Sequence, residues 1–127
     1  MRENIGLFKA KRIGTKERVQ GYYWTNRVGN HFITVVENKA GHFISPVDDE
    51  IDPETLCEFT GLTDKSGKMI WENDIVKHCA ENKPALVEFV KGQFSIAKYG
   101  YLLPSSDNFE VIGNKFDNPE LLEVRDE

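Results

Sequence analysis

Residues 59–77 constrain the fold of this chain more than any other stretch, because they combine apolar segments with two tight polar corners. The first corner is Asp64-Lys65-Ser66-Gly67, where an Asp side chain can accept hydrogen bonds within the turn and a Gly can adopt a positive φ. The second is Glu72-Asn73-Asp74, after which Ile75-Val76-Lys77 begins a segment of β-branched residues. The stretch therefore predicts a β-hairpin followed by a new strand.

The rest of the chain repeats this plan of short strands separated by turns. Segments rich in β-branched or aromatic residues alternate with Gly, Asn and Pro positions, without a long helical period. Further strands are expected over residues 7–12, 18–24, 31–36, 42–44, 85–90, 93–98 and 110–113. Pro after Asp or Asn predicts short helical turns near 52–55 and 118–122. The predicted fold class is mainly β, an antiparallel barrel or sandwich of short strands with one or two short helical turns.

Local composition adds detail to this plan. Lys91-Gly92 suits a two-residue hairpin connection. Strand alternation places Leu86 and Val90 on a common face. Residues 38–41 are expected to form a turn, and the acidic segment 47–53 is expected to form a loop.

Length and composition indicate one soluble globular domain over residues 1–127. Hydrophobic residues make up 39% of the chain and charged residues 29%. No apolar run approaches the roughly 20 residues that span a bilayer, and no apolar segment typical of a signal peptide follows Met1, so a cytoplasmic protein is expected. In that reducing compartment Cys57 and Cys79 are expected to be free thiols.

Charge divides the chain into two regions of opposite sign. Residues 1–47 hold eight Lys or Arg and three Asp or Glu, a net of +5, whereas residues 48–127 hold eight and eighteen, a net of −10. We accordingly distinguish a basic N-terminal β region, 1–54, from an acidic C-terminal β region, 55–127, which contains the hairpin TGLTDKSGK.

Cations and aromatic residues interleave in the basic region, as they do on surfaces that bind single-stranded nucleic acid. The candidate residues for such binding are Lys9, Lys11, Arg12, Arg18, Tyr22, Tyr23 and Trp24. Two alternatives fit the same pattern. The cations can form the solvated face of a hairpin whose aromatics face the core, or the basic region of one subunit can dock on the acidic region of another in a homo-oligomer.

The sequence gives little indication of a catalytic or metal-binding site. His31, His42 and His78 have no spacing typical of a metal site, and Cys79 should point to the opposite face of its strand from His78. The carboxylates of residues 48–54 lack the glycine and ligand spacing of a calcium loop. We therefore expect no catalytic residue, no metal site and no cofactor, and the sequence predicts a protein that is not an enzyme.

Three ordered motifs resemble a known family. Residues 60–76 read TGLTDKSGKMIWENDIV, which is similar to the pattern TGLxDKxGKxIxEGDIV. Residues 8–12 and 19–23, FKAKR and VQGYY, resemble FRGKR and VxGYY, and residues 109–122 resemble an ending EVIGNxxENPELL. These patterns are typical of the YopX family of bacteriophage and prophage proteins. Ala10 and Asn73 stand where that family usually has Gly.

The resemblance implies a fold and an origin but no mechanism, because the family supplies no catalytic residues. Its shared positions are expected to be structural: Gly61, Asp64, Gly67, Asp74, Gly113 and Pro119. The implied function is that of a phage or prophage accessory protein in the cytoplasm of a bacterial host. Such a protein would act as a non-enzymatic interaction module, as a homo-oligomer or with a phage or host protein, and nucleic-acid binding is the alternative.

Overall fold

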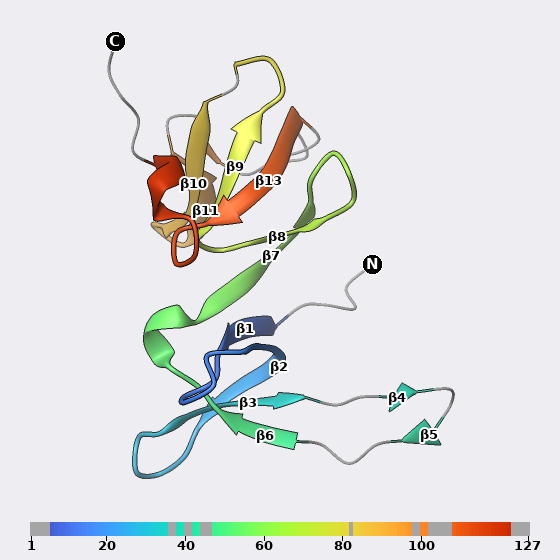
Figure 1. Cartoon of the computed structure of the whole chain (residues 1–127), viewed down its shortest axis with the longest axis vertical. Helices are drawn as coiled ribbons and strands as arrows, with labels where there is room; N and C mark the ends of the chain where they lie inside the picture. Colours follow the sequence, from blue (N-terminus) through green and yellow to red (C-terminus); the bar gives the residue numbers. More distant parts are fainter. Residues whose placement is uncertain are drawn as a thin grey trace. The chain divides into compact units, whose positions relative to one another are not determined.

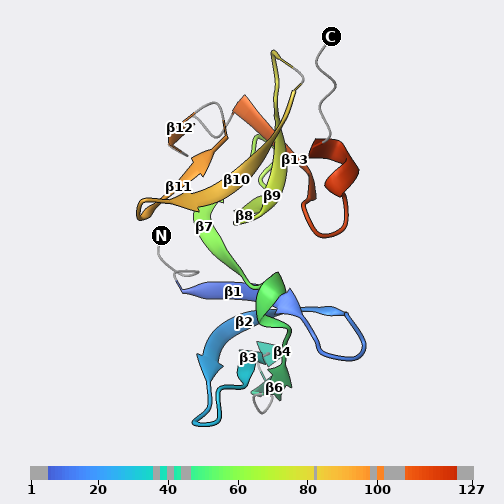
Figure 2. The same cartoon turned by 90° about the vertical axis from the view of Figure 1, so that its left-hand side faces the viewer.

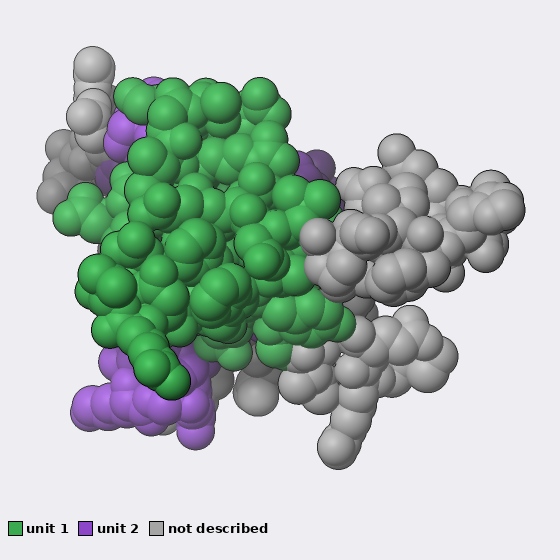
Figure 3. Space-filling view, turned by 90° about the horizontal axis from the view of Figure 1, so that it is seen from below, with its two compact units in different colours: residues 1–58 green, residues 59–127 purple. Residues whose placement is uncertain are grey.

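The computed structural model describes residues 6–35, 38–39, 42–43, 47–81, 83–97, 100–101 and 108–122. The chain divides into two compact units, residues 1–58 and 59–127, which are coloured separately in Figure 3. The boundary lies inside strand β7 (Cys57–Thr63). This strand pairs with β1 (Leu7–Lys11) through Cys57 and Glu58, and with β8 (Met69–Trp71) through Phe59 and Thr63. One strand therefore belongs to both units.

Unit 1 is built from a meander of antiparallel strands (Figure 1). Its elements are β1 (Leu7–Lys11), β2 (Arg18–Thr25), β3 (His31–Val35), β4 (Asn38–Lys39), β5 (His42–Phe43), β6 (Val47–Glu50) and the 3-10 turn η1 (Pro53–Thr55). The strand order of the main sheet is β6-β3-β2-β1-β7-β8, and β4 pairs with β5.

The core of unit 1 lies on one face of this sheet. Ala10, Val19, Ile33 and Ile51 are buried there. The pairing of β6 with β3 continues through Ile51, whose N–H donates to the carbonyl of His31, and the bridge between Arg12 and Ile51 connects the same residue to the end of β1. The sheet thus curls around Ile51, whose side chain is fully buried.

Unit 2 contains a second antiparallel sheet (Figure 2). Its elements are β8 (Met69–Trp71), β9 (Asp74–His78), β10 (Pro84–Val90), β11 (Gln93–Ile96), β12 (Gly100–Tyr101), β13 (Phe109–Asn114) and the 3-10 turn η3 (Pro119–Leu122). The strand order is β12-β11-β10-β9-β13. The core of unit 2 consists of Ile70, Val76, Ala85, Val87, Ile96, Phe109 and Val111.

The predicted fold class is confirmed. The described residues form antiparallel sheets of short strands with single 3-10 turns, and within them neither sheet closes into a barrel. The predicted hairpins at 64–67 and 91–92 are present, and both Lys91 and Gly92 adopt a positive φ. The turn after Asp52 is also present, with the carboxylate of Asp52 accepting a hydrogen bond from the N–H of Glu54.

Two local predictions were wrong. The acidic segment is not a loop over 47–50 but strand β6, because its backbone pairs with β3 over four residues. Charged side chains are common on an edge strand, where they discourage pairing with other chains. Asn38 and Lys39, expected in a turn, form β4. The prediction that Leu86 and Val90 share a face of β10 is confirmed, and the burial of Ala85 and Val87 shows that this face points away from the core.

Candidate interaction surface

The sheet of unit 1 has one face that does not pack on the core. Side chains alternate along each strand, so the residues between the core positions point to the other side. We call this side the outer face. By the strand register it comprises Leu7, Lys9, Lys11, Arg18, Gln20, Tyr22, Trp24, Phe32, Thr34, Asp48 and Glu50, together with Cys57 of β7, which is buried.

Aromatic side chains form the centre of the outer face. Trp24 stacks on Phe32, with ring centroids 4.6 Å apart and planes at 18°. The indole Nε1–H of Trp24 donates to the hydroxyl of Thr34 at 2.7 Å, and that hydroxyl donates to the Asp48 carboxylate at 2.6 Å. Tyr22 is 54% exposed and Trp24 40% exposed. Stacking and hydrogen bonds therefore hold a large aromatic surface in a fixed orientation while it remains accessible.

Charged side chains of both signs surround this centre. On β1 and β2, Lys11 lies directly opposite Arg18 in the strand register. On β6, Asp48 and Glu50 are exposed. Although β3 and β2 separate β6 from β1 in the strand order, the end of β6 lies beside the end of β1, where the N–H of Ile13 donates to the carbonyl of Glu50 at 3.0 Å. The outer face therefore has an acidic corner, formed by Asp48 and Glu50, next to the end of the strand that carries Lys11.

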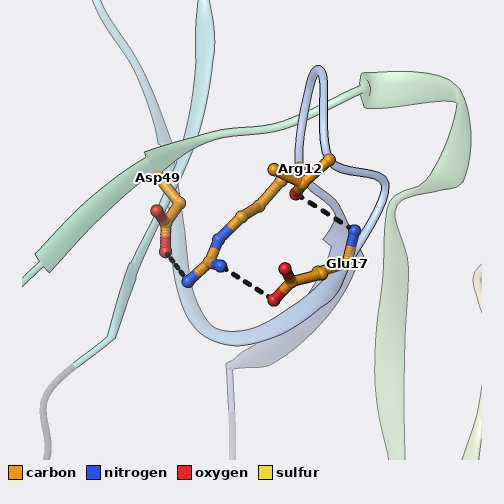
Figure 4. Close-up of polar contacts among 4 residues, drawn as sticks. Arg12, Glu17 and Asp49 are labelled. Atoms are coloured by element: carbon orange, nitrogen blue, oxygen red, sulfur yellow. Dashed lines mark hydrogen bonds and ion pairs between the residues drawn. The ribbon is translucent and has the colours of Figure 1, made fainter.

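Two of the seven residues expected at a nucleic-acid surface lie on the other face of the sheet. Tyr23 packs against Phe8, with centroids 5.5 Å apart, and its hydroxyl lies 2.6 Å from Nδ1 of His31. The guanidinium of Arg12 forms ion pairs with Glu17 at 3.2 Å and with Asp49 at 3.1 Å (Figure 4). The remaining five, Lys9, Lys11, Arg18, Tyr22 and Trp24, share the outer face.

The acidic segment is divided in the same way. Asp49 points toward Arg12, whereas Asp48 and Glu50 belong to the outer face. Among the described residues, no group of three or more His, Cys, Asp or Glu side chains is placed to hold a metal ion. Cys57 is buried and Cys79 exposed, and neither forms a disulfide bond in the part of the chain that the structure describes.

The shared structural positions of the family pattern lie in unit 2, and several have a clear local role. Asp64 is buried and accepts hydrogen bonds from the backbone N–H groups of Ser66, Lys68 and Val111. The buried Asp74 accepts one from the N–H of Trp71 at 2.8 Å. These carboxylates organise the hairpin and the corner that follows it, so neither is oriented toward a ligand.

The stack of Trp24 on Phe32 and the contact of Thr34 with Asp48 were not anticipated from sequence. Both depend on the pairing of β3 with β2 and β6. The available signal was the alternation itself, since Phe32 and Thr34 fall on the same face as Tyr22 and Trp24 once the hairpin register is known.

One general property follows from the secondary structure. No helix within the described residues is long and apolar enough to cross a membrane.

Comparison with known proteins places the chain in a family. A family model described as YopX protein matches residues 16–123. The crystal structure of protein EF1440 from Enterococcus faecalis is similar, with a TM-score of 0.64 and 21% sequence identity, over 94% of this chain and 99% of that chain. The TM-score shows a common fold and nothing further. No curated protein matches the chain. Because the family model spans most of the sequence, the chain belongs to the YopX family.

Proposed function

We propose that this protein is a non-enzymatic protein-interaction module and that the outer face of unit 1 is its contact surface. The observation that supports this proposal is the fixed and accessible aromatic centre, with Tyr22 and Trp24 exposed at its middle. Tyr and Trp are enriched where protein interfaces derive most of their binding energy. Charged residues at the rim, such as Arg18 and Glu50, then select the partner.

The family resemblance gives this module a biological setting. We propose that it is an accessory protein of phage or prophage origin that works in the cytoplasm of a bacterial host. Its partner is a protein surface with a complementary pattern of charge, from the phage, the host or another copy of the chain.

A protein partner fits the outer face better than a single-stranded nucleic acid does. One ring face of Trp24 already stacks on Phe32, which leaves less aromatic surface for a base. Asp48 and Glu50 stand on the same face and repel phosphate groups. The formal net charge of −5 adds a further repulsion.

Photo-crosslinking tests the proposed surface. A photoreactive phenylalanine derivative at Tyr22 is expected to give covalent protein adducts when cells producing the full chain are irradiated. The same derivative at Phe89, which is 51% exposed in unit 2, serves as the control. Adducts should form at Tyr22 in clear excess over Phe89. Absence of protein adducts at Tyr22, or equal yields at the two positions, would contradict the proposal.

Nucleic-acid binding is the second candidate, because five of the predicted residues do share one face. A fluorescence titration of Trp24 with mixed-sequence single-stranded DNA separates the two functions. If proteins are the partners, no saturable quenching is expected at low or physiological salt. Quenching that saturates, weakens with salt and disappears in the double variant Lys11→Glu/Arg18→Glu would establish the second candidate instead. The signal should be retained in Trp71→Phe, since Trp71 is buried in unit 2.

A further inference from the structure

We propose that the outer face binds an extended segment of a partner protein that carries arginine at alternate positions. This inference rests on the proposed function and names the chemistry of the partner. Three strands of the outer face, β2, β3 and β6, supply the residues that recognise this segment.

The strand register arranges the aromatic centre and the acidic corner in two parallel rows. Each row has an exposed aromatic residue on β2, one residue on β3 and an exposed acidic residue on β6. The rows are Tyr22, Thr34 and Asp48, and Trp24, Phe32 and Glu50. Because the rows are two residues apart along each strand, the distance between them is about 7 Å.

The carboxylates of both rows are available to a partner. Among the described residues, the side chain of Asp48 accepts one hydrogen bond, from the hydroxyl of Thr34 to a single oxygen, and neither Asp48 nor Glu50 forms an ion pair. Lys11, whose strand ends beside Glu50, has another interaction within the chain. The cations of the outer face therefore do not pair with these two carboxylates.

The aromatic surface next to these carboxylates suits a planar cation. Phe32 covers one face of the Trp24 indole, and Thr34 accepts the hydrogen bond of its Nε1–H. The exposed part of the ring therefore offers a π face, which attracts cations, and no further donor. Two successive hydrogen bonds connect the indole through Thr34 to Asp48, so the ring and the carboxylate are fixed near each other.

A guanidinium group meets both requirements. It stacks on aromatic faces, and its fork of N–H groups donates two parallel hydrogen bonds to a carboxylate. An ammonium group lacks the plane and is more strongly hydrated. Side chains two positions apart in an extended segment lie on one side, about 7 Å from each other. An Arg-x-Arg sequence therefore places one guanidinium in each row.

The size of the outer face fits a short segment better than a folded partner. Four strands about 4.8 Å apart and about five residues long give a patch of about 19 Å by 17 Å. Stable interfaces between folded proteins bury about 800 Å² on each side, which is much more than this patch offers. We therefore expect rapidly reversible binding of a segment of about five residues, with sub-millimolar affinity.

Titration with a defined peptide tests this inference. The probe is a blocked peptide in which arginine alternates with alanine, added to the full chain with Trp71→Phe so that Trp24 alone reports by fluorescence. A saturable change of emission is expected, because the guanidinium stacks on the indole. The same peptide with neutral citrulline in place of arginine should bind at least about tenfold more weakly, and the lysine peptide about threefold more weakly.

A matched pair of variants locates the binding site. Asp48→Asn/Glu50→Gln removes both charges but keeps an acceptor for the hydroxyl of Thr34, and it should weaken binding of the arginine peptide about tenfold. Glu54→Gln/Glu120→Gln makes the same change in net charge at exposed residues outside the outer face and should bind as the parent does. Circular dichroism checks that both variants are folded.

The citrulline comparison needs no change to a strand, so it remains decisive if the first variant does not fold. No saturable signal with the arginine peptide, equal binding of the citrulline peptide, or equal affinities of the two double variants would overturn the inference.

Crosslinking at Tyr22 distinguishes failure of this inference from failure of the proposed function. Mass spectrometry of the protein adducts should locate the crosslink in a segment with an Arg-x-Arg sequence. Protein adducts without binding of the arginine peptide preserve the interaction surface and overturn the arginine-bearing segment as its occupant. Arginine-selective binding without protein adducts preserves the ligand chemistry and contradicts the proposed function. Failure of both experiments contradicts both.

Discussion

Replacing Asp64 with Ala is expected to lower the free energy of unfolding of unit 2 by about 3 kcal/mol or more, because it leaves buried backbone donors without an acceptor. Asp64 as a whole residue is 4% exposed. One of its oxygens accepts hydrogen bonds from the N–H groups of Ser66 and Lys68, at 2.8 and 2.9 Å. The other accepts one from the N–H of Val111 at 2.9 Å.

The bond to Val111 gives this carboxylate a role beyond its own turn. It joins the hairpin of β7 and β8 to β13, far along the chain, and the N–H of Lys65 adds a second connection by donating to the carbonyl of Phe109. Without Asp64 the turn loses its internal acceptor and β13 loses a partner on its outer edge. We therefore expect the hairpin and β13 to loosen together.

The pH dependence of stability provides an independent check. Burial by itself raises the pKa of the Asp64 carboxyl, but hydrogen bonds from Val111, Lys68 and Ser66 and the charge of Lys68 hold the pKa below its ordinary value of 3.8. The folded state therefore binds this proton less tightly than the unfolded chain does. The resulting stabilisation is complete above the unfolded pKa and is lost as pH falls from about 4 through the lower folded pKa.

Thermal unfolding followed by the fluorescence of Trp71 measures both effects, in a Trp24→Phe background that removes the signal of unit 1. Asp64→Ala should lower Tm by roughly 10 °C. Asp64→Asn keeps the shape but not the charge, so its Tm should depend less on pH below 4 than that of the parent. Asp52→Ala is the matched control, because Asp52 caps only an exposed turn and should cost about 1 kcal/mol. Equal effects of the two Ala substitutions would contradict the role assigned to Asp64.

The hairpins of this protein could be predicted from sequence because their chemistry is local. Asp64 and Gly67 define one turn, and Lys91-Gly92 another, through residues that favour the required backbone angles. Asn73 likewise adopts a φ of 72°, which explains why Asn can replace the Gly usual in the family. At such positions the residue type itself favours the observed backbone conformation, so tertiary contacts are not needed to predict it.

Strand β6 could not be predicted, because its cause is not local. Val47-Asp48-Asp49-Glu50 has low β propensity, and its pairing with β3 supplies the hydrogen bonds that make it a strand. The side chain of Asp49 is neutralised by Arg12, which lies 37 positions earlier in the chain. Tertiary pairing overrode the local preference.

The same cause explains how much of the candidate surface could be anticipated. The interleaving of cations and aromatics indicated a functional strand pair, and alternation along β2 already separates Tyr23 from Tyr22 and Trp24. The acidic corner could not be anticipated, because it exists only when β6 joins the sheet. A basic surface expected from the first strands became a surface with two opposite charges.

Replacing Gly21 with Ala is expected to destabilise unit 1 by about 3 kcal/mol, since an added methyl group has no room there and overpacking forces the backbone to shift. Gly21 lies in the middle of β2. A Cβ at this position would overlap the carbonyl oxygen of Thr34 on the adjacent strand and would lie 3.1 Å from Cγ2 of Ile33. The carbonyl is part of the sheet, so the strain cannot be relieved by rotating a flexible side chain.

This prediction also gives a physical meaning to one of the family motifs. Gly21 is the glycine of Val19-Gln20-Gly21-Tyr22-Tyr23, and the geometry requires it for close packing of β2 on β3 rather than for an unusual φ. Unfolding followed by Trp24 fluorescence in a Trp71→Phe background measures the effect. Gly14→Ala is the control, because Gly14 has a φ of 94° with no atom near its added Cβ, and the backbone strain alone should cost about 1 kcal/mol. A loss of unfolding free energy in Gly21→Ala no larger than that in Gly14→Ala would contradict this prediction. It would mean that β2 and β3 can move apart without disturbing the core around Ile33, and that close packing does not explain the glycine of the motif.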